Sequence, residues 1–209
     1  MPTVLIARHG ETTWNVSGRY QGRLESELSS RGLAQAQALA EAAGGYDLGR
    51  ILSSPLKRCV STAQAVADRL ALSVEVDLRL IEIAHGTWEG RYRDELAAND
   101  SERYRCWRGS PESVAFEKGE SLADVLARWS DFARDFNPAA NTLLVTHDAV
   151  VRVAILERTG RPLADFWRPR VRNGCFAVFN VSGGNWVLRE ECIAGHLRGL
   201  TADISAQAL

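Results

Sequence analysis

Short apolar runs that alternate with longer helical patterns limit how this chain of 209 residues can fold. Residues Thr3–Ala7 predict a buried strand, and Ser29–Ala43 predicts a helix that ends at Gly44 and Gly45. The alternation continues, with strands expected at Arg50–Ser53, Ser73–Val76, Thr142–Thr146, Ala177–Val181 and Trp186–Arg189, and helices at Lys57–Leu70, Leu122–Phe136 and Ala149–Arg158. This pattern is typical of an α/β fold, and we expect a three-layer α/β/α sandwich with a mostly parallel sheet.

The end of the chain adds an antiparallel feature. Ser182–Asn185 carries two central glycines between two short apolar runs, which predicts a hairpin and places at least one antiparallel strand at an edge of the sheet. No repeat, low-complexity tract or linker divides the sequence. We therefore expect a single domain over residues 1–209, with Arg91–Gly119 as an irregular or helical insertion that caps one end.

The composition argues against two classes of partner, nucleic acids and membranes. The formal net charge of -1 argues against nucleic acid, because binding to a phosphate backbone relies on a clustered positive excess. The four cysteines are widely spaced without a C-x-x-C pair, which indicates free thiols in a reducing compartment. No apolar stretch reaches membrane-spanning length, and Arg8 interrupts the first apolar run too early for a signal peptide. We expect a cytoplasmic protein with no nucleic-acid or membrane partner.

Polar residues follow several of the expected strands where each strand ends. Arg8 and His9 follow the first strand, Arg58 lies shortly after the second, and His147 follows Thr142–Thr146. Glu82 lies between them in the sequence, in the run Leu-Ile-Glu-Ile. A histidine at a strand end can be a hydrogen-bonded structural residue. In open α/β sheets, however, ligands bind just beyond the carboxyl ends of strands, so we expect these five side chains to share one crevice.

Two histidines, two arginines and a glutamate suit the transfer of a phosphoryl group through histidine. Arginine matches the oxygens of a phosphate dianion, and nearby arginines favour the neutral imidazole that attack on phosphorus requires. A phosphohistidine intermediate would divide the displacement into two easier steps. The leaving alkoxide needs a proton, which a buried glutamic acid can donate.

The sequence resembles the histidine phosphatase superfamily, branch 1, which includes the cofactor-dependent phosphoglycerate mutases. Arg8–Asn15 resembles the family signature, and the similarity covers nearly the whole chain, with its segments in the family's order. The further matching segments are Gly18–Leu24, Leu28–Gly32, Ser53–Ala63, Glu82 with Gly86–Gly90, Gly119–Ser121, Val145–His147 with Arg152, and Asn173.

The resemblance implies a role for each matching residue. His9 would be the nucleophile that becomes phosphorylated, and Glu82 would donate a proton to the leaving group and then accept one from water. The phosphate would be held by Arg8, Arg58 and His147 with Asn15 as a further donor, and the substrate would touch Gln21 and Gly22. The four histidines lie far apart in the sequence and form no local metal motif, so we expect no metal and no cofactor.

Two residues near these motifs have alternative interpretations. The family most often has glycine after the second histidine, where this chain has Asp148. We expect Asp148 to cap the helix that begins at Ala149, pointing away from the site, although a carboxylate in the phosphate pocket is the alternative. His85 could line the pocket mouth, but we expect a partly exposed side chain without a catalytic role.

The activity that fits best is hydrolysis of a small phosphomonoester. The expected insertion has balanced charges, whereas a mutase needs extra cations and a closing lid, so 2,3-bisphosphoglycerate-dependent phosphoglycerate mutase is the second interpretation. A non-catalytic phospholigand-binding module is the third, although no expected catalytic residue is missing. The expected partner is the small-molecule substrate, and a homodimer is compatible with the sequence.

Overall fold

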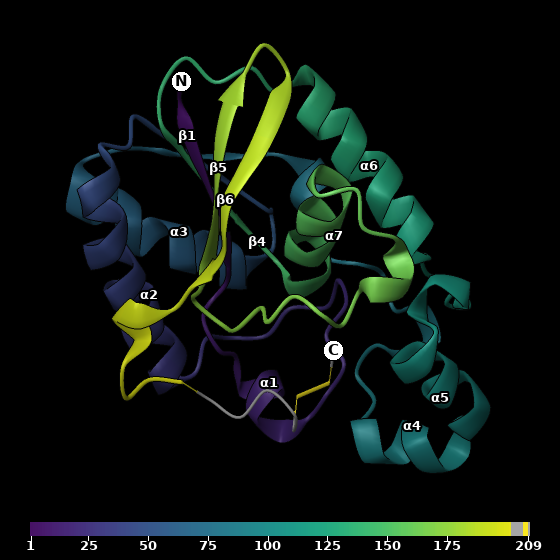
Figure 1. Ribbon diagram of the computed structural model, residues 1–209. Coiled ribbons are helices and arrows are strands. Elements are labelled where there is room, and N and C mark those ends of the chain that lie inside the picture. Colours follow the sequence, from purple (N-terminus) through teal and green to yellow (C-terminus); the bar gives the residue numbers. More distant parts are fainter. Residues whose placement is uncertain (202–206, 209) are drawn as a thin grey trace.

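The computed structural model describes residues 1–201 and 207–208, and within them a single mixed sheet forms the centre (Figure 1). Its strand order is β3-β2-β4-β1-β5-β6. The strands are β1 (Thr3–Arg8), β2 (Arg50–Ser53), β3 (Val74–Val76), β4 (Thr142–Thr146), β5 (Phe176–Ser182) and β6 (Asn185–Ile193). The first four strands are parallel, whereas β5 runs antiparallel to β1 and β6 antiparallel to β5. The expected mostly parallel sheet with an antiparallel edge is confirmed.

Helices cover both faces of this sheet. The helices are α1 (Thr13–Ser17), α2 (Ser30–Ala43), α3 (Lys57–Leu70), α4 (Arg93–Asn99), α5 (Ser101–Gly109), α6 (Leu122–Asp135) and α7 (Asp148–Arg158). Figure 1 shows α2 and α3 on one side of the sheet and α6 and α7 on the other. Two apolar cores result, one beneath each helix pair, because each face of a buried sheet has to be covered. The three-layer expectation is therefore confirmed.

The two terminal strands form the expected hairpin. Ser182 pairs with Asn185, so Gly183 and Gly184 form a two-residue turn. Both glycines have positive φ, at 56° and 77°, a conformation that a residue with a Cβ rarely adopts and that a tight hairpin turn requires. Strand β6 continues to Ile193, beyond the predicted end at Arg189.

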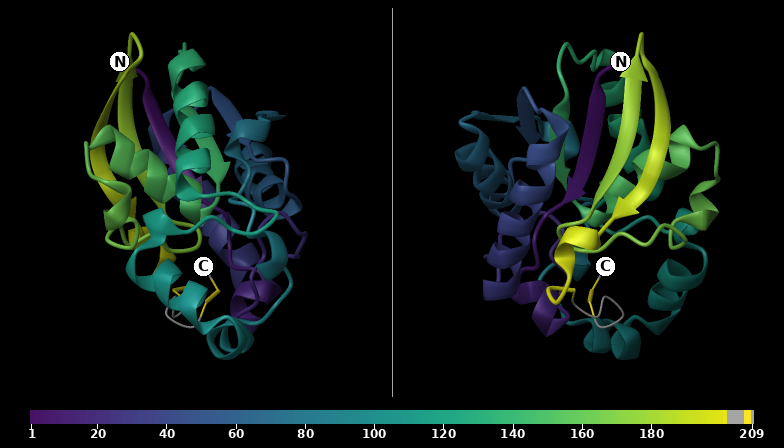
Figure 2. Two further views of the ribbon diagram at one scale, coloured as in Figure 1. Left: turned by 90° about the vertical axis from the view of Figure 1, so that its right-hand side faces the viewer. Right: turned by 60° about the vertical axis from the view of Figure 1, so that its left-hand side comes forward.

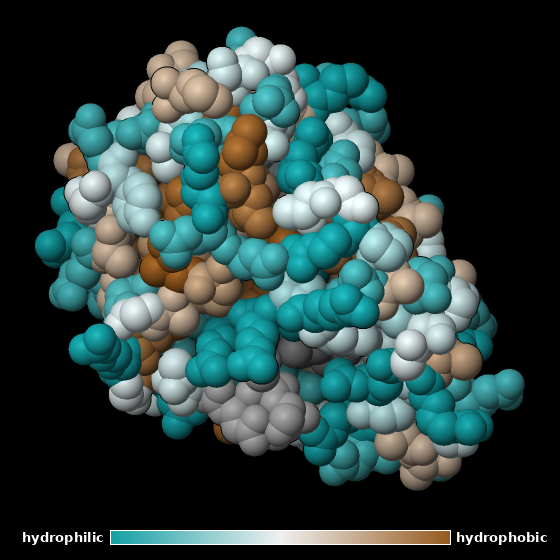
Figure 3. Space-filling view, in the orientation of Figure 1, coloured by the Kyte–Doolittle hydropathy of each residue, from teal (hydrophilic) through white to brown (hydrophobic). Residues whose placement is uncertain are grey.

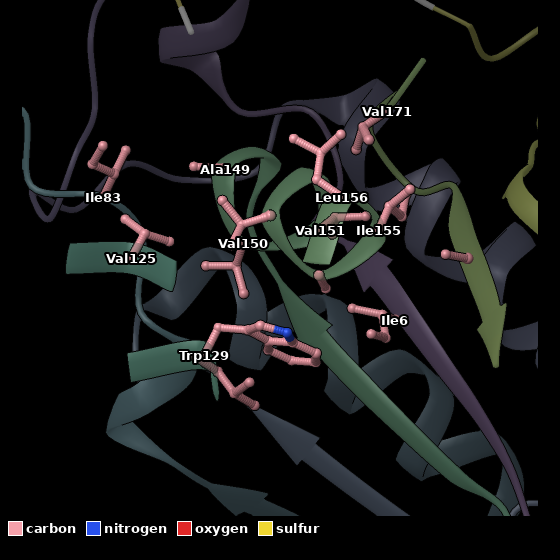
Figure 4. Close-up of a cluster of buried hydrophobic side chains, with 14 of the residues drawn as sticks. Ile6, Ile83, Val125, Trp129, Ala149, Val150, Val151, Ile155, Leu156 and Val171 are labelled. Carbon is pink, nitrogen blue, oxygen red and sulfur yellow. The ribbon is translucent and has the colours of Figure 1, made fainter. Parts of the chain in front are cut away.

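Helix α7 is buried on nearly all sides and supports the end of β4. Figure 4 shows its apolar side chains among residues of the sheet and of α6, with Val150 near Trp129 and Ala149 toward Ile83. Burying one such side chain contributes roughly 1.5–3 kcal/mol, so the helix is firmly held. Its N-cap residue is His147, which therefore has a fixed backbone position.

Three helices were not predicted individually. Helix α1 has only five residues and is defined by a capping box between Thr12 and Asn15. Helices α4 and α5 lie in the expected insertion, where the chain is strongly charged and only Leu96 and Trp107 of these two helices are buried, so their apolar periodicity is weak. Figures 1 and 2 show α1, α4 and α5 gathered at the end of the sheet toward which β1 runs.

Hydrophilic side chains cover much of the face seen in Figure 3, with smaller apolar areas between them. Among the described residues, no helix combines the length and the apolar character that crossing a bilayer requires.

Candidate active site

The two sequence-predicted histidines lie next to each other because their strands are neighbours in the sheet. Arg8 pairs with Thr146 across β1 and β4, and the backbone N–H of His9 donates to the carbonyl of Thr146 at 2.9 Å. The rings of His9 and His147 meet edge to face with centroids 5.2 Å apart. The parallel strands thus deliver both side chains to one point, as the sequence pattern predicted.

His9 is held neutral with one ring nitrogen available. Its Nδ1 lies 2.7 Å from the carbonyl oxygen of Gly10. A carbonyl oxygen can only accept, so Nδ1 carries the proton and Nε2 keeps its lone pair. Burial lowers the pKa of His9 well below its ordinary value, and the guanidinium groups of Arg58 and Arg8 lower it further, because each disfavours a second positive charge.

Two buried arginines that line a cavity together with this histidine each have one N–H group without a hydrogen-bond partner among the described residues. Arg58, near the start of α3, uses its Nη atoms on the carbonyls of Leu24 and Gly22 at 2.8 and 2.6 Å. Arg8 uses its Nη atoms on Val171 at 3.3 Å and on Gln207 at 2.9 Å. Within residues 1–201 and 207–208, the Nε atoms of both arginines have no hydrogen-bond partner. An unpaired buried donor is costly, so these groups are suited to an anion.

Asn15 offers a third donor of this kind. Its Oδ1 accepts from the backbone N–H of Thr12 at 3.0 Å and from Nδ2 of Asn173 at 3.3 Å, which fixes the amide. The Nδ2 group of Asn15 is buried and has no partner among the described residues. Asn173 also donates to the carbonyl of His9 at 3.3 Å and so ties α1 to the histidine.

Glu82, the acid expected from the sequence, lines the cavity. It lies in the loop after the single-turn helix Leu78–Leu80, and its Oε1 accepts from the backbone N–H of Ile83 at 2.9 Å. Burial raises the pKa of Glu82 to about 7, and the negative charge of Asp148 adds to that rise. The carboxyl group therefore holds a proton close to neutral pH, as general acid catalysis requires.

His147 is brought to the site but is already engaged. Its Nε2 lies 2.7 Å from Oγ of Ser54 and 3.3 Å from Sγ of Cys59, and its Nδ1 is 4.0 Å from Oε2 of Glu82. Burial and the charge of Arg58 lower the pKa of His147 well below its ordinary value, so the ring is neutral. The serine and the cysteine were not singled out from the sequence, although both lie in the segment Ser53–Ala63.

Arg8, His9, Arg58 and Glu82 line one cavity, and Gln21 and Gly22 line it as well. The amide oxygen of Gln21 accepts from Oγ1 of Thr12 at 2.9 Å. Gly22 has a φ of +50°, and a Cβ there would overlap the carboxylate of Glu89. Gly22 therefore contributes through its backbone, chiefly by accepting the hydrogen bond from Arg58.

Our prediction that Asp148 caps a helix is wrong. Asp148 is the first residue of α7, and its carboxylate makes ion pairs with Arg8 at 3.3 Å and Arg152 at 2.6 Å. It lines the cavity together with Glu82. Two buried guanidinium groups attract the carboxylate more strongly than the backbone N–H groups at the start of α7 would. The sequence signal was an aspartate at a position where the family most often has glycine, and the prediction gave this aspartate the wrong role.

His85 also differs from its prediction, because it is only 5% exposed. Its ring meets those of Tyr20, Phe116 and Trp107 at centroid distances of 5.0, 4.8 and 5.9 Å. Burial lowers the pKa of His85 to about 3, with the charge of Arg58 as the second cause. Neither ring nitrogen has a hydrogen-bond partner in the described part of the chain, and the residue lines the cavity.

Near the end of the chain, Gln207 and Ala208 also reach the site. The amide of Gln207 accepts from Arg8 and donates to Oδ1 of Asn173 at 2.9 Å, and Ala208 lines the cavity. No sequence signal marked these residues. Over the two described ranges, no group of three or more His, Cys, Asp and Glu side chains is arranged to hold a metal ion.

Comparison with known proteins assigns this chain to a family. Residues 4–193 match the family model of the histidine phosphatase superfamily, branch 1. The chain belongs to this superfamily. Phosphoserine phosphatase 1 of Hydrogenobacter thermophilus is 34% identical over 200 residues, which are 94% of this chain and 95% of that protein. Adenosylcobalamin/alpha-ribazole phosphatase of Escherichia coli is 32% identical over 180 residues, 85% and 89% of the two chains.

The fold agrees with solved structures of similar sequence. The structure titled Bacillus stearothermophilus YhfR superimposes with a TM-score of 0.87 at 29% identity, covering 94% of this chain and all of that one (100%). The predicted family and fold class are therefore confirmed, and the phosphatase names of these relatives support the predicted class of phosphoric monoester hydrolase.

Proposed function

We propose that this chain hydrolyses small phosphomonoesters through a phosphohistidine formed at His9. The observation that carries the proposal is the meeting, in one buried cavity, of a neutral histidine, two arginines with unpaired Nε groups and a carboxyl group whose pKa is about 7. Each of these groups can serve one part of phosphoryl transfer: the histidine attacks phosphorus, the arginines hold the phosphoryl oxygens, and the carboxyl group gives its proton to the leaving oxygen.

The reaction follows from these positions in two displacements. Nε2 of His9 attacks phosphorus while the bond to the ester oxygen breaks, and Glu82 gives its proton to the leaving oxygen. The N–H donors of Arg8, Arg58 and Asn15 hold the phosphoryl oxygens, where charge accumulates. Glu82, now a carboxylate, then accepts a proton from water as the water oxygen bonds to phosphorus and the P–N bond breaks. Inorganic phosphate leaves, and both side chains return to their starting states.

For the substrate we propose a small polar ester, with phosphoserine as the first candidate. The 34% identity with a phosphoserine phosphatase extends over nearly the whole of both chains. His85 offers two unpaired ring nitrogens at the cavity wall, which suit a polar group on the leaving alcohol. A buried site of this kind discriminates strongly against an analogue without that group, because its own polar atoms would stay unpaired.

The deciding experiment measures phosphate release from a panel of small phosphomonoesters, with and without a chelator. The wild type is compared with His9→Ala and with Glu82→Gln, which preserves the shape of the acid. Acid-quenched protein is examined for an acid-labile phosphoryl group on His9. We expect release by the wild type, none by His9→Ala, and slow release by Glu82→Gln for esters of poor leaving groups, with less loss for p-nitrophenyl phosphate.

Three results would contradict the proposal. Interconversion of 3- and 2-phosphoglycerate with added 2,3-bisphosphoglycerate, and little phosphate released, would indicate a mutase. Binding of phosphate esters without turnover of any would indicate a non-catalytic module. Release that His9→Ala retains would remove His9 from the reaction.

A further inference from the structure

Asp148 is the one acidic residue besides Glu82 among the described residues that line the cavity. It is 3% exposed and lies between two arginines, with Oδ1 3.3 Å from Nη1 of Arg8 and Oδ2 2.6 Å from Nε of Arg152. A carboxylate beside a phosphate site opposes a dianion, so its presence needs a compensating benefit.

Arg152 fixes the carboxylate in this place. Its guanidinium group donates to the backbone carbonyls of Phe166 and Pro169, and it lies over the rings of Phe166 and Trp167 at 5.5 and 5.1 Å. Arg152 is also one turn of α7 away from Asp148. With its partner held from three sides, Asp148 has little freedom to turn out of the cavity.

We propose that Asp148 is a positioning residue of this hydrolase: its carboxylate, held by Arg152, keeps Arg8 in place and puts a fixed negative charge in the cavity that Glu82 also lines. This inference rests on the proposed function. Without Asp148, the buried guanidinium groups of Arg8 and Arg152 would face each other with no countercharge between them. With it, the site contains a fixed negative charge that leaves the proton of Glu82 in place until the substrate is bound.

The charges around Glu82 come from every element packed against it. Asp148 is the acidic neighbour and disfavours ionisation, whereas the cationic neighbours favour it. In the described part of the chain, the charged and titratable groups near Glu82 are Asp148 of α7, Arg8 of β1, Arg58 and Cys59 of α3, Arg128 of α6, the ring of His147, and Arg23, whose Nε donates to the backbone carbonyl of Glu82 at 3.4 Å. The cations are the more numerous, so without Asp148 only burial would oppose their effect on Glu82.

Two substitutions separate the charge of Asp148 from its hold on Arg8. Asp148→Asn removes the charge but keeps an oxygen at the position of Oδ1, which lies 3.3 Å from Nη1 of Arg8. Asp148→Gly removes both, and glycine at this position is the residue most often found in the family. Glu11→Gln is the matched control, because Glu11 is also a buried carboxylate, paired with Arg31 at 3.1 Å, but does not line the cavity.

The readouts are the pH profile of kcat/KM and the inhibition constant of inorganic phosphate. We expect the alkaline limb, which reports Glu82 in the free enzyme, to move to lower pH by on the order of one unit in both Asp148 variants, and to stay in place in Glu11→Gln. Phosphate should bind several-fold more tightly to Asp148→Asn than to the wild type, and more weakly to Asp148→Gly than to Asp148→Asn.

The effect of Asp148 on Glu82 and its hold on Arg8 can be refuted separately. An alkaline limb in Asp148→Asn that coincides with that of the wild type overturns the effect on Glu82. Equal phosphate affinity in the Asn and Gly variants overturns the hold on Arg8. Infrared spectra of the unreacted protein follow the Glu82 carboxyl band directly, with Glu82→Gln as the reference. This measurement tests the inference even if no ester is hydrolysed, in which case the proposed function alone would fail.

Discussion

Replacing Glu82 by glutamine should make the protein more stable in a way that depends on pH. In the folded protein the pKa of Glu82 is about 7, against an ordinary value of 4.5. Between these two values the unfolded chain ionises Glu82 while the folded chain keeps the proton, so the stability of the wild type falls as pH rises. Glutamine has no proton to lose, and its oxygen can still accept from the backbone N–H of Ile83.

The size of the effect follows from the same two values. At about 1.4 kcal/mol per pH unit, the full difference corresponds to about 3 kcal/mol above pH 7, and it vanishes below pH 4. Urea unfolding of both proteins at pH 5 and pH 8 measures it. We expect the advantage of Glu82→Gln to be about 2–3 kcal/mol larger at pH 8 than at pH 5.

A control variant separates this effect from a general loss of charge. Glu75 lies at the surface in an ion pair with Arg50, whose hydrogen bond lowers the pKa of Glu75. Glu75 is thus ionised in both states across this range, and Glu75→Gln should show no change in its effect between pH 5 and pH 8. Equal stability differences at the two pH values for Glu82→Gln would refute the conclusion that folding keeps Glu82 protonated.

Three further substitutions test the construction of the site. Gly10→Ala would place a Cβ 2.4 Å from the carbonyl oxygen of Gly32, so the free energy of unfolding in urea should fall by about 1–3 kcal/mol, whereas Gly45→Ala, with nothing within 4 Å, should not show this loss. Asn15→Ala removes an unpaired donor, and the inhibition constant of orthovanadate should rise at least tenfold; an unchanged constant would place the phosphate elsewhere. His85→Phe keeps an aromatic ring without nitrogens, so KM should rise for phosphoserine and change little for p-nitrophenyl phosphate; equal effects on both esters would exclude a role in recognising the alcohol.

The sequence was sufficient for the parts of the site that depend on local pattern. Residues His9 and His147 each follow a continuous apolar strand, and the ends of parallel strands meet, so their closeness was predictable. The residues of the capping box at the start of α6, Ser121 and Asp124, are only three positions apart in the sequence. Predicting features of this kind needs only the residues of one turn or one strand, together with the rule that the ends of parallel strands meet at one edge of a sheet.

The remaining features depend on residues far apart in the sequence. Asp148 looked like a helix cap because one of its two partners, Arg8, lies far away in the sequence, although the other, Arg152, is only four residues further on. His85 is buried by rings from three separate segments, none of which is adjacent to it. The contact of Gln207 with Arg8 has no local signature at all. Packing of this kind is decided by tertiary structure, and a single sequence does not display it.

The position of β1 in the sheet has a consequence for synthesis of the chain. Its two neighbours are β4, which begins at Thr142, and β5, which begins at Phe176. Until the ribosome reaches Thr142, the apolar strand β1 therefore has neither of its neighbours to pair with. A nascent chain in this state exposes an unpaired hydrophobic edge that favours aggregation and attracts chaperones. His9, the proposed nucleophile, precedes both neighbouring strands in the sequence, so its pocket can close only after β4 and β5 have been synthesised.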